Sequence, residues 1–197
     1  ARSVRITGGA WRSRRLDGPG RTTAVRPTPD AMRERAFAVL GERVHGARFL
    51  DLFAGTGAVG LEALSRGAAA ATFVERDPTT ARVLRANCAR FDLETARAAV
   101  LVRPVAAALR ELARTGAAFE LAWADPPFES WREGLEALAA AFSSGLLAGD
   151  ALTCLECPAK AEVAGALPAS LEIARDLKGG ASRVVMIRRV GAGTSNV

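Results

Sequence analysis

A glycine-rich turn constrains the fold of this chain more than any other feature. Residues 48–53 form a short apolar run suited to a buried strand, and Gly55, Gly57 and Gly60 follow it where a helical apolar pattern begins. Glycine permits a positive φ and lets a ligand approach the backbone closely, while the start of the helix offers unpaired N–H groups. The turn therefore predicts a strand–turn–helix unit that binds a ligand such as a dinucleotide.

Two acids near the turn bear on the choice of ligand. Glu75 ends the next predicted strand, where nucleotide-binding folds place an acid for the ribose. Asp51 stands at the carboxyl end of the first strand, and no Lys or Arg lies between it and Ser65. A pyrophosphate there would meet a repulsion of roughly several kcal/mol. S-adenosylmethionine carries an ammonium and a sulfonium but no phosphate, so Asp51 favours it over a nicotinamide dinucleotide; in a simpler interpretation Asp51 only caps the helix.

The sequence DPPF, from Asp125 to Phe128, follows a predicted strand at 119–124 and lies on the same rim of the sheet. The exocyclic amine of a base is a poor nucleophile because its lone pair is delocalised into the ring. Acceptors at the Asp125 carboxylate and the Pro126 carbonyl would bind its two hydrogens and aim the lone pair at a methyl group. Pro127 restricts Pro126 to an extended conformation. Phe128 offers a face for stacking, worth roughly 1–3 kcal/mol per base. A proline-stiffened loop is the alternative.

With these motifs in place, the chain resembles the bacterial small-subunit ribosomal RNA methyltransferases of the RsmD type. The resemblance rests on RITGG (5–9), RPTPDAMRERAF (26–37), DLFAGTGAVGLEALSRGA (51–68), FVERD (73–77) and DPPF (125–128). It implies an α/β class I methyltransferase fold, Rossmann-like, with a seven-stranded doubly wound sheet. It also implies S-adenosyl-L-methionine as the donor. The implied acceptor is the N2 amine of a guanine in 16S rRNA of an assembled or assembling small ribosomal subunit.

The motifs and the resemblance together give a set of candidate site residues. For catalysis we expect Asp125, Pro126 and Phe128, and no metal. For the cofactor we expect Asp51, Phe53, Gly55, Thr56, Gly57, Gly60, Glu75, Arg76, Pro104, Val105 and Asp125.

The chain departs from the family pattern in two places. The segment 100–105 lacks the acid that relatives place there for the adenine amine, so a backbone group or packing must hold the adenine. Lys178-Gly179-Gly180 stands where relatives tend to have Tyr-Gly.

The net charge is concentrated at the N-terminus. Residues 1–35 hold nine Arg against three acids, a net of +6, whereas the other 162 residues carry 18 basic and 18 acidic side chains. Phosphate contacts supply much of the affinity for nucleic acids, so this charge predicts an RNA-binding arm. A solvated tail is the alternative. The candidate RNA-binding residues are Arg5, Trp11, Arg12, Arg14, Arg15, Arg21, Arg26 and Arg33.

The length of 197 residues and a hydrophobic content of 49% suit one α/β domain with a small extension. We expect a basic β-hairpin arm at 1–28, a linking helix at 29–45, the methyltransferase domain at 46–190 and a flexible tail at 191–197. Strands are predicted near 48–53, 70–75, 98–103, 119–124, 150–156, 169–177 and 183–189.

Cysteine and histidine usage gives no metal site. Cys154 and Cys157 have zinc-like spacing, but a second pair is missing and three-residue spacing in a strand turns the two side chains to opposite faces. His45 is the single histidine. The sequence has no 18-residue apolar run, signal-peptide core or disulfide framework, so a soluble cytoplasmic protein without a membrane partner is expected. We also expect a monomer.

Other functions stay open on the sequence alone. The same DPPF chemistry would serve a DNA or other RNA amino-methyltransferase, although no separate base-recognition domain is visible. A non-catalytic RNA-binding assembly factor on a methyltransferase fold is the alternative from another class; the intact Asp125 and glycine turn argue against it.

Overall fold

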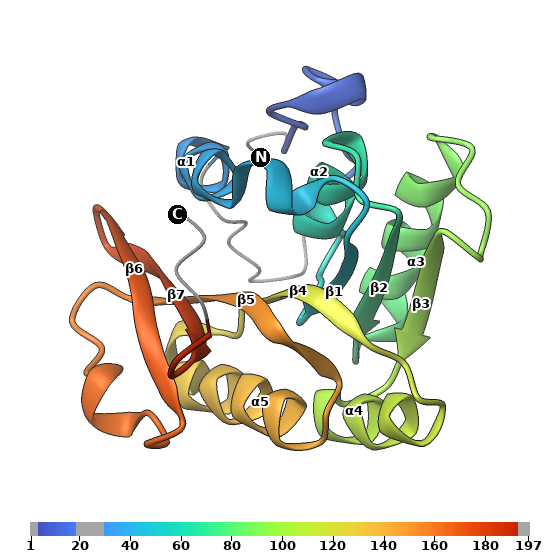
Figure 1. Ribbon diagram of the computed structural model, residues 1–197. Coiled ribbons are helices and arrows are strands. Elements are labelled where there is room, and N and C mark those ends of the chain that lie inside the picture. The colour runs from blue at the N-terminus through green and yellow to red at the C-terminus, as the bar shows by residue number, and fades with distance from the viewer. Residues whose placement is uncertain (1–3, 19–29, 193–197) are drawn as a thin grey trace.

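Seven strands form one mixed sheet in the order β3-β2-β1-β4-β5-β7-β6 (Figure 1). The computed structural model describes residues 4–18 and 30–192. Strands β1 to β5 pair in parallel, and β7 lies antiparallel between β5 and β6. The strands are β1 (Arg48–Leu52), β2 (Ala70–Glu75), β3 (Ala98–Val102), β4 (Phe119–Ala124), β5 (Leu147–Pro158), β6 (Leu171–Gly179) and β7 (Ser182–Arg189).

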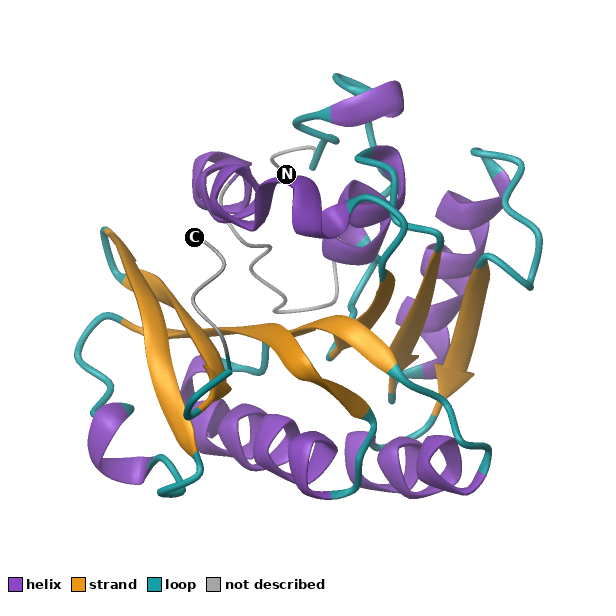
Figure 2. Cartoon of the chain, in the orientation of Figure 1, coloured by secondary structure: helices purple, strands orange, loops and turns teal. Residues whose placement is uncertain are grey.

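Five α-helices cover both faces of the sheet (Figures 1 and 2). α1, α2 and α3 lie on one face, and α4 and α5 on the other, which confirms the predicted doubly wound α/β sheet. The helices are α1 (Asp30–Leu40), α2 (Ala58–Ser65), α3 (Pro78–Ala89), α4 (Val105–Arg114) and α5 (Trp131–Ser143). Short 3₁₀ turns are η1 (Gly9–Trp11), η2 (Gly41–Val44), η3 (Phe128–Ser130) and η4 (Ala164–Ala166).

Strand residues alternate between two apolar cores. On β1, Phe49 enters the core beneath α1–α3, while Leu50 and Leu52 enter the core above α4 and α5. The ring centroids of Phe37 and Phe49, and those of Phe37 and Trp123, are each 6.1 Å apart. This stacking fixes α1 on the sheet, so the linking helix is part of the core.

Residues 4–18 fold back on themselves and pack on α2. An antiparallel bridge joins Arg5 to Arg15, and the Ile6 N–H donates to the Arg14 carbonyl over 2.9 Å. Three apolar side chains of this segment join the core beneath α1–α3: Val4, Ile6 and Leu16. The predicted arm boundary at residue 28, Arg21, Arg26 and most of the predicted tail lie outside the described residues.

The predicted cysteine geometry is confirmed for the C-x-x-C pair. Both side chains are buried, Cys154 in the core beneath α1–α3 and Cys157 in the other. Burial raises the pKa of the Cys157 thiol, and the nearby Arg183 lowers it by a smaller amount. Within the described ranges, every helix is too short or too polar to span a membrane.

Candidate functional site

One large cleft, the rim cleft, opens at the carboxyl ends of the parallel strands and has a volume of about 1430 Å³. It lies where the strand order reverses between β1 and β4, the usual ligand position in a doubly wound sheet. The candidate site residues that line it are Asp51, Phe53, Gly55, Thr56, Glu75, Arg76, Pro104, Val105, Asp125, Pro126 and Phe128. The fold therefore brings together nearly all the residues proposed for cofactor and catalysis.

The glycine turn has a left-handed backbone at three points. Phe53, Gly55 and Gly57 have φ values of 61°, 55° and 86°. Glycine adopts such values without strain, whereas a positive φ is unfavourable for Phe53. Backbone strain of this kind is typical of ligand-binding turns. The turn thus folds back sharply between β1 and α2, and residues 53–56 line the rim cleft.

Gly57 and Gly60 do not line the rim cleft, because their missing side chains serve helix packing. A Cβ on Gly57 would lie 2.2 Å from Leu84 Cδ1, and one on Gly60 would lie 2.3 Å from Phe73 Cε1. Both glycines therefore let α2 approach α3 and β2. Their expected direct contact with the cofactor stays a prediction.

Asp51 both braces α2 and lines the rim cleft. Its side chain is buried, and one carboxylate oxygen accepts the Gly60 N–H over 2.8 Å, so it braces the first turn of α2. It also lines the rim cleft. Burial raises the pKa of the Asp51 carboxyl to about 7; the Gly60 N–H opposes this rise, and the charge of Glu75 adds to it.

Glu75 ends β2 with both carboxylate oxygens oriented by backbone donors. Oε2 accepts the Gly55 N–H over 2.9 Å, and Oε1 accepts the Asp77 N–H over 2.8 Å. Each oxygen keeps a second lone pair for a hydroxyl group from the cleft. Glu75 is therefore both a brace for the glycine turn and an acceptor suited to a ribose.

The DPPF loop is held at both ends. The Asp125 N–H donates to the Leu52 carbonyl over 3.3 Å, and the Pro127 carbonyl accepts the Ser130 N–H over 2.8 Å. Phe128 is 37% exposed, an unusual degree for a large apolar side chain. The loop therefore presents an aromatic face at the rim cleft.

Gly134 on α5 is a supporting residue that no motif indicated. A Cβ at this position would lie 2.7 Å from Pro126 Cγ and 2.9 Å from Leu155 Cδ1. The missing side chain lets Pro126 seat against the helix, which positions the Pro126 carbonyl.

The candidate RNA-binding residues differ in exposure. Arg12, Arg14 and Arg15 are exposed, and Arg5 is 61% exposed while it pairs with an acid of α1. The ring of Trp11 stacks on Phe91 with centroids 4.4 Å apart, so one of its faces is already covered. The exposed arginines remain candidates for phosphate contacts.

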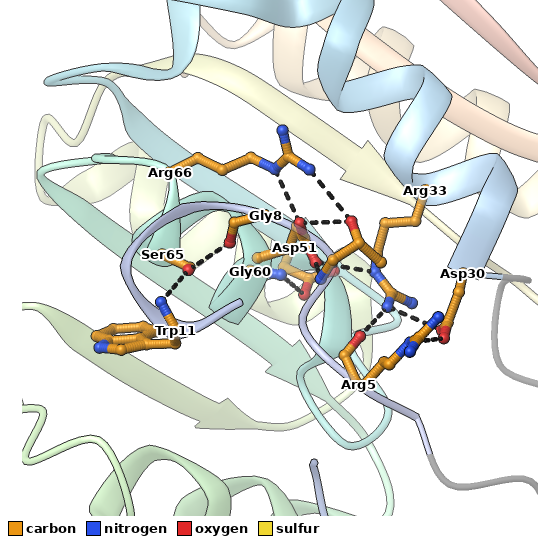
Figure 3. A network of polar contacts seen from close by, with 11 residues as sticks. Arg5, Gly8, Trp11, Asp30, Arg33, Asp51, Gly60, Ser65 and Arg66 are labelled. Atoms are coloured by element: carbon orange, nitrogen blue, oxygen red, sulfur yellow. Dashed lines mark hydrogen bonds and ion pairs between the residues drawn. The ribbon is translucent and has the colours of Figure 1, made fainter. Parts of the chain in front are cut away.

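Arg33 is the exception, because it is completely buried in a polar network between α1, α2 and the N-terminal segment (Figure 3). Its Nε lies 3.3 Å from a Glu62 oxygen, and its Nη2 lies 3.0 Å from an Asp30 oxygen and donates to the Arg5 carbonyl. Glu62 also accepts from the N–H and hydroxyl of Thr7, over 2.7 and 2.8 Å. Arg33 cannot reach a phosphate, so the prediction that it binds RNA is wrong.

Replacing Arg33 with methionine will lower the free energy of unfolding by about 3 kcal/mol, because Glu62 loses a partner while fully buried. Urea denaturation followed by circular dichroism measures this change. Arg35→Met is the matched control, since Arg35 is exposed on the same helix, and it should cost less than about 1 kcal/mol. Equal and small losses for the two variants would show that the network does not stabilise the fold.

Comparisons with known proteins agree with this geometry. Residues 4–188 match the family model described as conserved hypothetical protein 95. The chain is 39% identical over 170 residues to the Escherichia coli K12 protein named ribosomal RNA small subunit methyltransferase D, covering 84% of this chain and 78% of that protein.

Two solved structures are similar over almost their full length. A putative methyltransferase from Escherichia coli, yhhF, has a TM-score of 0.78 and 35% identity, covering 95% of this chain and 98% of that one. The hypothetical protein TTHA0928 from Thermus thermophilus has a TM-score of 0.76 and 34% identity, covering 94% of this chain and 99% of that one.

Proposed function

The chain belongs to the family of ribosomal RNA small subunit methyltransferase D, described as conserved hypothetical protein 95, and we propose that it methylates the exocyclic N2 amine of a guanine in 16S rRNA. The methyl donor is S-adenosylmethionine. One observation carries the proposal: the glycine turn, Glu75 and the DPPF loop line a single cleft, so a donor and a base can meet there.

The donor half of the rim cleft fits S-adenosylmethionine. Glu75 offers oriented acceptors for the ribose hydroxyls, and the buried Asp51 suits a cationic group better than a phosphate. Pro104 and Val105 line the cleft where β3 leads into α4, and we assign the adenine to this segment. When bound, the donor supplies an electrophilic methyl group on its sulfonium.

The acceptor half of the cleft is the DPPF loop. The Asp125 carboxylate and the Pro126 carbonyl would accept the two hydrogens of the guanine N2 amine and turn its lone pair toward the methyl group. The methyl group would leave the sulfur as its bond to the amine nitrogen forms, and the Asp125 carboxylate would accept the proton that the amine loses. The exposed ring of Phe128 would hold the base by stacking.

The substrate context is a finer part of the proposal. We assign the enzyme to rRNA within an assembled or assembling small ribosomal subunit, as a monomer acting in the cytoplasm. Supplying labelled donor with small subunits, naked 16S rRNA and DNA in parallel tests this assignment. Label in the subunits with little in naked rRNA supports the subunit as substrate, and label in naked rRNA alone or in DNA alone contradicts it. Donor binding without turnover on any substrate would favour a non-catalytic assembly factor.

Donor affinity will depend on pH through Asp51. The pKa of about 7 means that the free protein holds this carboxyl largely protonated below neutrality, whereas a cationic donor needs the carboxylate. The dissociation constant should therefore rise about tenfold for each pH unit below 7, down to about pH 5.5. Isothermal titration calorimetry across this range, in buffers of different ionisation enthalpy, measures the affinity and the protons released.

The Asp51 carboxyl also determines how the stability of the free protein changes with pH. Because its folded pKa lies above the ordinary value of 3.8, its ionisation destabilises the free protein, and the loss develops as pH rises from about 4 toward 7. Asp51→Asn keeps an acceptor for the Gly60 N–H and should flatten both pH dependences. Wild-type affinity that is constant from pH 5.5 to 7.5 would refute the role of Asp51 at the donor.

A further inference from the structure

A second buried carboxylate lies in the rim cleft, on the opposite side of Asp125 from the glycine turn. Glu156 is on β5, is 3% exposed and lines the cleft. The sheet order β2-β1-β4-β5 places the donor acids Glu75 and Asp51 on the first two strands and the DPPF loop on the third. Glu156 therefore lies on the side of the rim cleft that would hold the base, away from the side that would hold the donor.

The strand register puts Glu156 beside the reacting amine. Ala124 of β4 pairs with Leu155 of β5, so Asp125 and Glu156 follow at the same level of two adjacent strands. Ala124, Leu155 and Cys157 all enter the core above α4 and α5. Because successive side chains of a strand point to opposite faces, Asp125 and Glu156 both point to the other face of the sheet. Adjacent strands lie about 4.8 Å apart.

The chemistry of a carboxylate restricts what it can recognise. An ionised carboxylate has about four lone-pair sites and only accepts hydrogen bonds, so even one that already has a protein partner can accept a further hydrogen from a ligand in the cleft. Guanine presents N1–H directly next to its N2 amine, whereas adenine and 2-aminopurine present a lone pair at N1. If Asp125 and Pro126 bind the N2 amine of a guanine, N1–H is the neighbouring donor on the same edge of the base.

We propose that Glu156 is the specificity residue of the acceptor site and accepts the N1–H of the target guanine. This inference rests on the proposed function and adds how the base is selected. A purine with a lone pair at N1 would face the Glu156 carboxylate with repulsion and without a hydrogen bond, and a site built on a buried polar group discriminates strongly against such an analogue.

The test compares guanine with 2-aminopurine at the target position. 2-Aminopurine keeps the 2-amino group but lacks both N1–H and the O6 carbonyl, so a Glu156→Gln variant is needed to separate the two losses. The methylated position is first mapped with wild-type enzyme, and 16S rRNA carrying either base there is then made by splint ligation and reconstituted into small subunits. Wild-type enzyme should show kcat/KM about 100-fold lower on the 2-aminopurine substrate.

The variant Glu156→Gln gives a readout that a purely structural role would not move. The glutamine amide can donate to the N1 lone pair of 2-aminopurine, so the guanine preference should narrow to less than about tenfold even though the rate on guanine falls. Loss of fold alone would lower both rates equally. Glu162→Gln, exposed and outside the cleft, is the matched control and should keep the wild-type ratio.

Failure of the inference and failure of the proposed function are separable. Wild-type enzyme that methylates both bases equally well, or a Glu156→Gln variant that retains the full 100-fold preference, would overturn the role of Glu156 while guanine methylation stands. Absence of any methylation of the guanine subunits by wild type would overturn the function itself. If Glu156→Gln does not fold, equal wild-type rates on the two bases still overturn the inference.

Discussion

Replacing Asp125 with alanine will lower kcat for methyl transfer by about 10²- to 10⁴-fold and leave the dissociation constant of the donor within about threefold. The carboxylate acts on the acceptor amine, so its loss removes orientation and charge stabilisation that matter in the transition state. The backbone N–H that anchors the loop to Leu52 is retained in the variant, so the loop keeps its position.

Single-turnover kinetics with small subunits measure the rate, and calorimetry measures donor binding. Asp125→Asn is an intermediate case, since its amide oxygen can accept one hydrogen but carries no charge. Asp150→Ala serves as the matched control because Asp150 is exposed and far along the chain from the loop. Methylation by Asp125→Ala at the parent rate would disprove the amine-acceptor mechanism.

Replacing Arg12 and Arg15 together with glutamine will weaken binding to small subunits by about tenfold or more near physiological salt. The slope of log K against log salt concentration should fall by about two units, one for each lost phosphate contact. Both side chains are exposed on the segment that carries the excess positive charge. Donor affinity should not change, because neither residue lines the rim cleft.

The matched control for the arm is Arg132→Gln with Lys160→Gln, which removes the same charge from exposed sites elsewhere. If the two double variants lose equal affinity and equal slope, the arm contributes only net charge. Deleting residues 1–25 is an unsuitable test, since the segment supplies Val4 and Ile6 to the core and donors to the buried Glu62. Its loss would uncover part of the core and take donors from Glu62 as well as remove the arginines.

The fold was predictable from the sequence where apolar runs end sharply. β2 and β4 have the predicted bounds, because each is a mostly apolar run that ends at an acid of the rim, Glu75 within β2 and Asp125 just after β4. β5 begins at Leu147, earlier than predicted, since a register shift between Phe119 and Leu121 lets it pair with β4 across an irregular stretch. Where the register shifts, the strand lacks the regular alternation of apolar and polar residues by which a sequence reveals a strand.

The site was predictable where residues follow strand ends and less so elsewhere. The excess of arginine in residues 1–35 led to the prediction that Arg33 binds RNA. Its partner Glu62 is 29 residues away in the sequence, and only the fold brings the two together. Gly134 and Glu156 belong to no motif; the one available signal was an acid inside the apolar run of β5. A local sequence pattern cannot show that a helix glycine leaves room for a proline of the DPPF loop.

The most direct measurement of the central claim is the identity of the methylated nucleoside. Small subunits that lack the modification are incubated with the protein and S-adenosylmethionine, and the 16S rRNA is digested and analysed by mass spectrometry. The account predicts one N2-methylguanosine per subunit, absent with Asp125→Ala. N6-methyladenosine, a ring-methylated guanosine or no methylated product in 16S rRNA would contradict it.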